Sequence, residues 1–170
     1  MNTDSLSTIE LIACGHEEFK NDRFSWALLF FSAAKSRDDF QAEHFAPLGR
    51  TYAKLGLFDQ AKESFLAFLH HFPEAYIERF QLGLVYRDLS DDDLAIAEFD
   101  QVIAQQPAFP PALYYKALCC LAKEDATSAE FLLNELLENT EEDNLYVKLT
   151  HELAEKLELN LSSSENVNPQ

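Results

Sequence analysis

Small and large apolar residues recur along the chain at one fixed spacing, the step that leads from Gly15 to Gly49 and on to Gly83. Written in rows of that length, the sequence has one column of small residues, a second of alanine and a third of large apolar residues. These columns hold Gly15, Gly49, Gly83 and Ala117, then Ala27, Ala61, Ala95 and Ala129, then Phe31, Phe65, Phe99 and Leu133. The four rows are 8–41, 42–75, 76–109 and 110–143, and such a period is typical of a structural unit stacked on copies of itself.

Within each row the apolar spacing is that of two antiparallel helices. In the second row, Gly49 and Ala61 leave room for the two helix backbones to approach each other. Tyr52 and Phe65 supply the bulk around that contact, and Pro73 ends the second helix because proline cannot donate to the helical ladder. The sequence therefore predicts an all-α protein of four helix pairs.

Pro47 stands inside the expected first helix of its row. Proline is accepted in the first turn of a helix, where its missing N–H is not needed, but it breaks the ladder further in. We expect this helix to begin late, near Ala46 and Pro47, and so to widen the entrance of the groove beside it; a bend with one missing hydrogen bond is the alternative.

The residues after the fourth row predict one more helix, at about 142–159. Its leucines recur every fourth residue and face one way, and we expect them to cover the exposed edge of the last repeat. They are Leu145, Leu149, Leu153 and Leu157, with Tyr146 beside them. The segment 160–170 is rich in Ser and Asn and has little to bury, which predicts a disordered tail after one domain at 1–159.

The row pattern resembles the tetratricopeptide repeat. The third row carries it most fully, with Leu82-Gly83 followed by Tyr86, Ala95, Phe99 and finally Pro107. The first and fourth rows depart from it, as end repeats do when one face meets no neighbour. The resemblance implies a right-handed α-solenoid of four such pairs with a C-terminal capping helix.

In tetratricopeptide folds the first helices line the concave face, so the resemblance implies a peptide groove there. The side chains that the repeat register places in it are mostly apolar and slightly basic. The candidate groove residues are Ile12, His16, Phe19, Lys20, Arg50, Lys54, Ile77, Phe80, Leu84, Arg87, Tyr114, Tyr115 and Leu118. Such a groove favours a partner segment that is apolar with some acid. Packing against neighbouring repeats or against the last helix is the alternative use of the same stripe.

Charge separates this groove from the rest of the surface. The chain has 13 Lys and Arg against 30 Asp and Glu, a net charge of −17, which would repel a nucleic acid backbone. The excess of acid falls outside the groove positions, where it favours solubility.

The second helix of the first row has an additional apolar stripe, which includes Trp26, Leu29 and Phe30. Either the residues before Thr8 fold over it, or another chain does. A homodimer or a partner protein at this patch is therefore a second hypothesis.

The chain is also loosely similar to the cytosolic chaperones of type III secretion translocators. These chaperones are acidic, of similar length and built of tetratricopeptide repeats, and the similarity is clearest in 109–129. It implies that a class II secretion chaperone is an alternative function.

We find no residues arranged for catalysis, for a cofactor or for a metal. The five histidines have no Cys or carboxylate at zinc-ligand spacing, and there is no phosphate-binding loop or nucleophile elbow. Cys14, Cys119 and Cys120 are too few for a disulfide framework, which favours the cytoplasm, and no apolar window is long enough to insert into a membrane. The sequence therefore predicts a non-catalytic protein–protein interaction module, adaptor or chaperone-like, which holds an extended or helical peptide segment; a self-assembling homo-oligomeric scaffold is the alternative.

Overall fold

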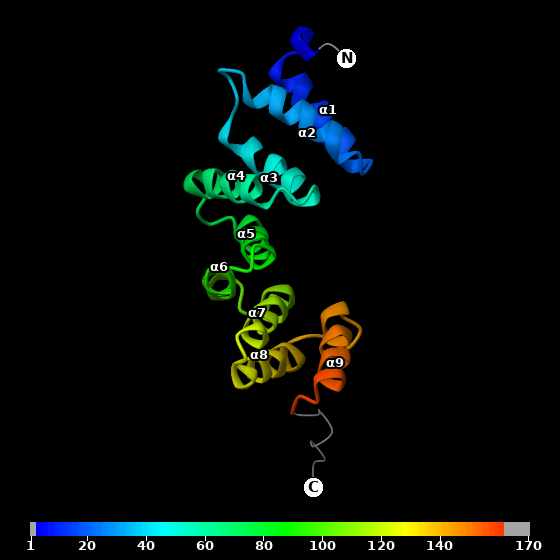
Figure 1. Ribbon diagram of the computed structural model, residues 1–170, viewed down its shortest axis with the longest axis vertical. Helices are drawn as coiled ribbons and strands as arrows, with labels where there is room; N and C mark the ends of the chain where they lie inside the picture. Colours follow the sequence, from blue (N-terminus) through cyan, green and yellow to red (C-terminus); the bar gives the residue numbers. More distant parts are fainter. Residues whose placement is uncertain (1–2, 162–170) are drawn as a thin grey trace. The chain divides into compact units, whose positions relative to one another are not determined.

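The computed structural model describes residues 3–161, and helices occupy each of the four rows (Figure 1). Within that range no strand is present. The elements are η1 Thr3–Ser5, α1 Thr8–Lys20, α2 Phe24–Lys35, η2 Ala42–His44, α3 Phe45–Lys54, α4 Phe58–His71, α5 Tyr76–Asp88, α6 Asp92–Gln105, α7 Pro110–Ala122, α8 Ala126–Asn139 and α9 Leu145–Leu157. Two α-helices fall in each predicted row and α9 follows the last, as the sequence pattern predicts.

The chain divides into two compact units, one ending at Ser90 and the other beginning at Asp91. In the first unit α1 packs against α2 and α3 against α4, while α2 also meets α3 and α4 meets α5. In the second unit α6 packs against α7, α7 against α8, and α9 against both α7 and α8. The third row contributes α5 to one unit and α6 to the other, so the single domain at 1–159 stays a prediction.

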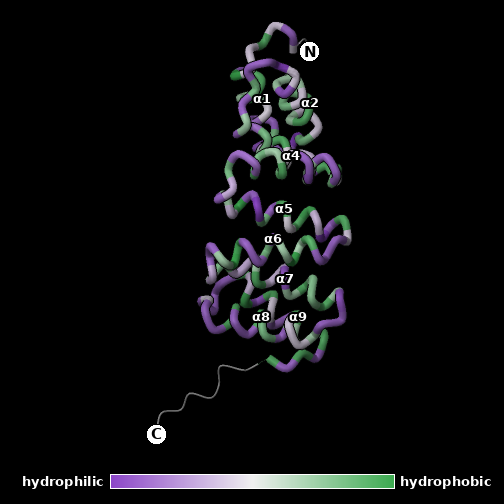
Figure 2. The backbone as a smooth tube through the Cα atoms, turned by 90° about the vertical axis from the view of Figure 1, so that its left-hand side faces the viewer, coloured by the Kyte–Doolittle hydropathy of each residue, from purple (hydrophilic) through white to green (hydrophobic). Residues whose placement is uncertain are grey.

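The helix pairs are held together where small and large residues meet. Hydrophobic and hydrophilic residues alternate along the helices, as expected where one face is buried and the other is solvated (Figure 2). Phe31 and Phe65 are fully buried on the second helices of their rows. Their rings lie against Gly15 and Gly49 of the first helices, so the small-residue column marks the close approach that it predicts.

The late start predicted for the first helix of the second row is confirmed. A 3-10 turn precedes α3, which begins at Phe45, and Pro47 falls in its first turn. Within α3, the carbonyl of Pro47 accepts a hydrogen bond from Thr51 Oγ1 at 2.8 Å. Proline therefore costs α3 no ladder hydrogen bond.

The packing face of α9 differs from the predicted leucine stripe, which is wrong in part. Val147 and Thr150 are the buried residues of α9, whereas Leu145 is 63% exposed and Leu157 is also exposed. Val147 stands one repeat period after the buried Leu113 of α7. The helix thus packs in the register of a first helix of a fifth row, and this register, not the leucine spacing, selects the buried face.

Two residues of the predicted tail belong to the described part of the chain. The backbone N–H of Asn160 donates to Glu130 Oε1 at 2.8 Å, and Leu161 packs against the apolar cluster of the second unit. The remainder of that prediction, 162–170, lies outside the described residues. Among the helices of residues 3–161, none is long and apolar enough to cross a membrane.

Candidate functional site

Arg50 links the first helices of the first unit. It lies on α3 and donates from Nη1 to Glu78 Oε1 of α5 at 2.9 Å. On α1, burial lowers the pKa of His16, and the positive charges of Arg50 and His44 lower it further. The structure therefore brings two predicted groove residues, His16 and Arg50, into one electrostatic environment. It adds Glu78, an acid that the sequence reasoning missed.

Lysines end the first two of these helices. Lys20 is the last residue of α1 and Lys54 the last of α3, where a cation also suits the helix dipole. Lys54 Nζ lies 6.0 Å from the ring centroid of Phe24, and this ring meets Phe19 edge-on at 5.3 Å. Both lysines are exposed, and no carboxylate within residues 3–161 forms an ion pair with either. They give this end of the predicted groove its positive charge.

The first helix of the third row, α5, contributes an ion-paired arginine and apolar side chains. Arg87, in the last turn of α5, forms an ion pair with Asp88 at 2.7 Å, so it adds little net charge. Ile77 is exposed and Leu84 is half-buried, which leaves both accessible to a ligand. Apolar and basic side chains thus share the predicted face of the first unit.

Two predicted groove residues lie in the core instead. Ile12 and Phe80 are buried, each with 7% of its surface exposed. Ile12 belongs to the cluster that includes Leu11 and Phe31, so it holds α1 against α2. Neither side chain offers much surface to a ligand, and this corrects their assignment as contact residues.

In the second unit, α9 lies over part of the predicted groove. The Tyr146 ring is 5.6 Å from that of Tyr114 and 6.2 Å from that of Tyr115, and these two α7 rings are 5.6 Å apart. Burial raises the pKa of Tyr114 and of Tyr146. Leu118 stays half-buried on the same helix. The chain's own capping helix therefore already contacts the aromatic residues that were expected to meet a peptide.

The apolar patch predicted on α2 is smaller than expected. Trp26 is 49% exposed and Leu29 is also exposed, but Phe30 is only 2% exposed and belongs to the core. Leu6 packs against the cluster that contains Phe30, and the Arg37 guanidinium donates to the carbonyl of Leu6 at 3.5 Å. The N-terminal segment thus covers the Phe30 side, and only Trp26 and Leu29 remain available to another chain.

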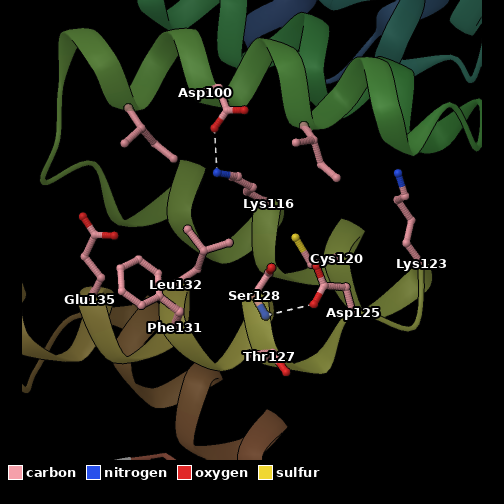
Figure 3. Close-up of a pocket in the computed structure, with 12 residues that line it drawn as sticks. Asp100, Lys116, Cys120, Lys123, Asp125, Thr127, Ser128, Phe131, Leu132 and Glu135 are labelled. Atoms are coloured by element: carbon pink, nitrogen blue, oxygen red, sulfur yellow. Dashed lines mark hydrogen bonds and ion pairs between the residues drawn. The ribbon is translucent and has the colours of Figure 1, made fainter.

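A pocket of about 610 Å³ that the sequence did not predict opens in the second unit (Figure 3). Residues of α6 and α8 form its walls, and the side chains of Lys116 and Cys120, from α7, lie between them. The apolar lining is Ile96, Ile103, Phe131 and Leu132. The sequence predicted a groove on the first helices and an apolar patch on the second helix of the first row, but not this pocket, although Ile96 and Ile103 form a second apolar stripe on α6.

Ion pairs and a helix cap order the polar lining of this pocket. Lys116 Nζ meets Asp100 Oδ1 at 2.6 Å, and Lys123 forms an ion pair with Asp93. Asp125 accepts a hydrogen bond from the backbone N–H of Ser128 at 3.1 Å, which caps α8. Hydrogen bonding with the Ser128 side chain, and then this backbone bond, lower the pKa of Asp125.

The one thiol in the pocket is unsuited to nucleophilic chemistry. Burial raises the pKa of Cys120, which keeps the thiol protonated at neutral pH. In the part of the chain that the structure describes, no three His, Cys, Asp or Glu side chains are grouped to hold a metal ion.

Comparison with known families identifies the repeat. A family model described as Tetratricopeptide repeat matches residues 47–110 and 80–144, which together make up more than half of the chain. The chain therefore belongs to the tetratricopeptide repeat family, as its row pattern predicts, and proteins of this family are protein–protein interaction modules.

Solved structures of the same fold support this assignment. YrrB, described as a tetratricopeptide repeat protein with an unusual peptide-binding site, has a TM-score of 0.80 at 19% identity, over 88% of this chain and 76% of its own. MamA has a TM-score of 0.73 at 19% identity, over 85% of each chain. MamA 41-end from Desulfovibrio magneticus RS-1 has a TM-score of 0.77 at 16% identity, over 89% of this chain and 85% of its own. These likenesses confirm the all-α tetratricopeptide solenoid class, and no curated protein matches the sequence.

Proposed function

We propose that the first unit binds a segment of a partner protein across the first helices α1, α3 and α5, and that this segment is apolar with acidic side chains. The observation that carries the proposal is the pair Lys20 and Lys54. In a chain with 30 acids and 13 bases, both lysines lie exposed without a carboxylate partner among the described residues. Their charge suits an acid supplied by another molecule.

Apolar contact comes from the same face. Ile77 is exposed on α5 and Leu84 and Phe19 are half-buried, so a ligand would remove apolar surface from water. Arg50, paired with Glu78 of α5 and near enough to His16 of α1 to lower its pKa, supports a guanidinium as part of the same surface. The fold likeness to a protein described as having a peptide-binding site supports a peptide as the ligand class.

Three short synthetic peptides with the same Leu and Phe positions would test this proposal. Their polar positions would be Asp and Glu in one, Lys in the second and Ser in the third. We expect fluorescence anisotropy to give the tightest binding for the acidic peptide. The double variant Lys20→Glu, Lys54→Glu should weaken it at least about tenfold, because two attractive contacts become repulsive.

A matched control changes the same charge elsewhere. The variant Lys148→Glu, Lys156→Glu alters two lysines of α9, both exposed, and leaves the first unit intact. Equal loss of acidic-peptide binding in the two double variants would refute the proposal, since net charge alone would then explain the binding.

Self-association through α2 is a second candidate, favoured by the exposure of Trp26 and Leu29 on one helix. Sedimentation over a range of concentrations should show dimers for the wild type and monomers for Trp26→Glu. Leu94→Glu, at an exposed leucine of α6, is the control. Monomers at all concentrations for the wild type would eliminate this candidate. Adaptor, chaperone and type III secretion chaperone roles, and a cytoplasmic location, stay predictions from the sequence.

A further inference from the structure

We propose that the pocket between α6 and α8 is a second protein-binding site, and that it takes an amphipathic segment with an apolar anchor flanked by Lys or Arg. This site belongs to the second unit and prefers the opposite charge from the surface proposed on the first unit. The two sites would therefore select different partner segments.

The apolar lining of the pocket favours an apolar side chain on the partner segment. Ile96 and Ile103 of α6 and Leu132 of α8 line the pocket, and none of the three is fully exposed. Phe131, on the α8 wall, is 69% exposed, so residues 91–161 leave much of this aromatic ring uncovered. A Leu or Phe side chain inserted between α6 and α8 would remove the Phe131 ring and the isoleucines from water together.

The charged residues around the pocket favour a basic partner segment. From Asp91 onward the chain has 17 Asp and Glu residues against 4 Lys and no Arg. The two lysines of the lining are already neutralised, Lys116 by Asp100 and Lys123 by Asp93. Glu135 also lines the pocket, and its carboxylate forms no ion pair with any cation of residues 3–161. The net potential at the pocket is therefore negative, and it favours Lys or Arg on the occupant.

The chain's own segments do not suit the pocket. The helix α9 is engaged with α7 through Tyr146 and with the α8 cluster through Val147. The sequence 162–170 contains one acid and no Lys or Arg, so it lacks the required charge. A second copy of this acidic unit would bring like charges together. A basic segment of another protein is the occupant that the chemistry favours.

Three short fluorescein-labelled peptides serve as probes. The first carries Leu and Phe at helical spacing with Lys elsewhere, the second has Glu in place of Lys, and the third keeps Lys but has Ser in place of the anchors. Anisotropy is measured in about 0.15 M salt, which screens distant charges. The first probe should bind more tightly than the third, and Phe131→Asp should weaken the first probe but not the second, which the first unit is proposed to bind. The Lys20→Glu, Lys54→Glu variant should bind the first probe no more weakly than the wild type, so failure here is separable from failure of the proposed function.

Variants of the pocket have matched controls on the same helices. Phe131→Asp should weaken the first probe at least about tenfold, and Glu135→Lys about tenfold. Leu94→Asp and Glu138→Lys make similar chemical changes at exposed positions outside the lining, and they should stay within about twofold of the wild type. Because Phe131 is exposed, its substitution should leave the fold intact, which circular dichroism checks.

Three results would overturn the proposal. Equal binding of the first and third peptides would mean that charge alone attracts the probe. Equal affinity of Phe131→Asp and Leu94→Asp would place the binding elsewhere. A wild-type dimer that Phe131→Asp converts to a monomer in sedimentation would make a second copy the occupant.

Discussion

The ring of Phe31 on α2 lies against Gly15 on α1 so closely that a Cβ at Gly15 would stand 2.6 Å from Cε1 of the ring. In the equivalent pair of the second row, a Cβ at Gly49 would stand 3.1 Å from Cε1 of Phe65. The first helix pair is therefore the more tightly closed of the two, although its row departs further from the family pattern.

Alanine at these glycines should have unequal effects. Both substitutions gain about 1 kcal/mol of helix propensity, so the difference between them reports the clash with the ring. We expect Gly15→Ala to destabilise the first unit by about 1–3 kcal/mol, because its Cβ would overlap the fully buried Phe31 ring, and Gly49→Ala to be close to neutral, because its Cβ has more space. Urea denaturation of both variants measures this, and equal free energies of unfolding would contradict it.

The packing face of α9 can be tested with two neighbouring residues. Val147→Ala should destabilise the second unit by about 2 kcal/mol, because it leaves a cavity against the core cluster. Leu145→Ala removes more atoms but should cost less than about 0.5 kcal/mol, since that side chain is exposed. Thermal denaturation should rank them in this order; the reverse order would restore the leucine stripe as the buried face.

The stability of the first unit should depend on pH through His16. Its pKa in the folded protein lies below the ordinary value of about 6.5, so in the window between the two values the unfolded chain binds more protons. Stability should therefore fall as the pH is lowered through that window and stay level above it. His16→Gln should remove this part of the pH dependence of the melting temperature, and an unchanged profile would mean that His16 does not contribute.

Arg50→Gln should raise the pKa of His16 towards its ordinary value, because one of the positive charges that lower it is removed. An NMR titration of the imidazole protons gives this pKa directly. Lys62→Gln, on α4 and paired there with Asp59, is a control that should leave it unchanged. An unchanged His16 pKa in Arg50→Gln would mean that Arg50 of α3 does not act on His16 of α1, and it would count against the proposed surface.

The three cysteines should differ in their rates of alkylation. Cys14 is half-buried, whereas Cys119 and Cys120 are buried and burial raises the pKa of Cys120. Thiolates are the reactive species, so we expect iodoacetamide to modify Cys14 first and Cys120 slowly. Mass spectrometry of peptides over time measures the order, and early labelling of Cys120 would indicate that the pocket opens further than the structure shows.

The helices were predictable from the sequence because the repeat period places one small and one large residue at each close contact, as at Gly15 and Phe31. The exposed faces were less predictable. The same apolar spacing describes Ile12, which is buried, and Ile77, which is exposed, because burial depends on the neighbouring helix and not on the helix itself. The pocket lay outside the prediction for a further reason: it is formed by second helices, and its one exposed aromatic, Phe131, has no counterpart column in the repeat.

The register of α9 has a consequence for the packing of a second helix against it. One repeat period after Ala117 stands His151, in the column that holds Gly or Ala in all four full rows. At Gly15 and Gly49 the small residue of that column admits a phenylalanine ring of the second helix, and on α9 an exposed imidazole takes that place instead. The helix α9 therefore differs from the first helices of the four rows at the position where a second helix packs, because the imidazole of His151 takes the space that a small residue leaves open.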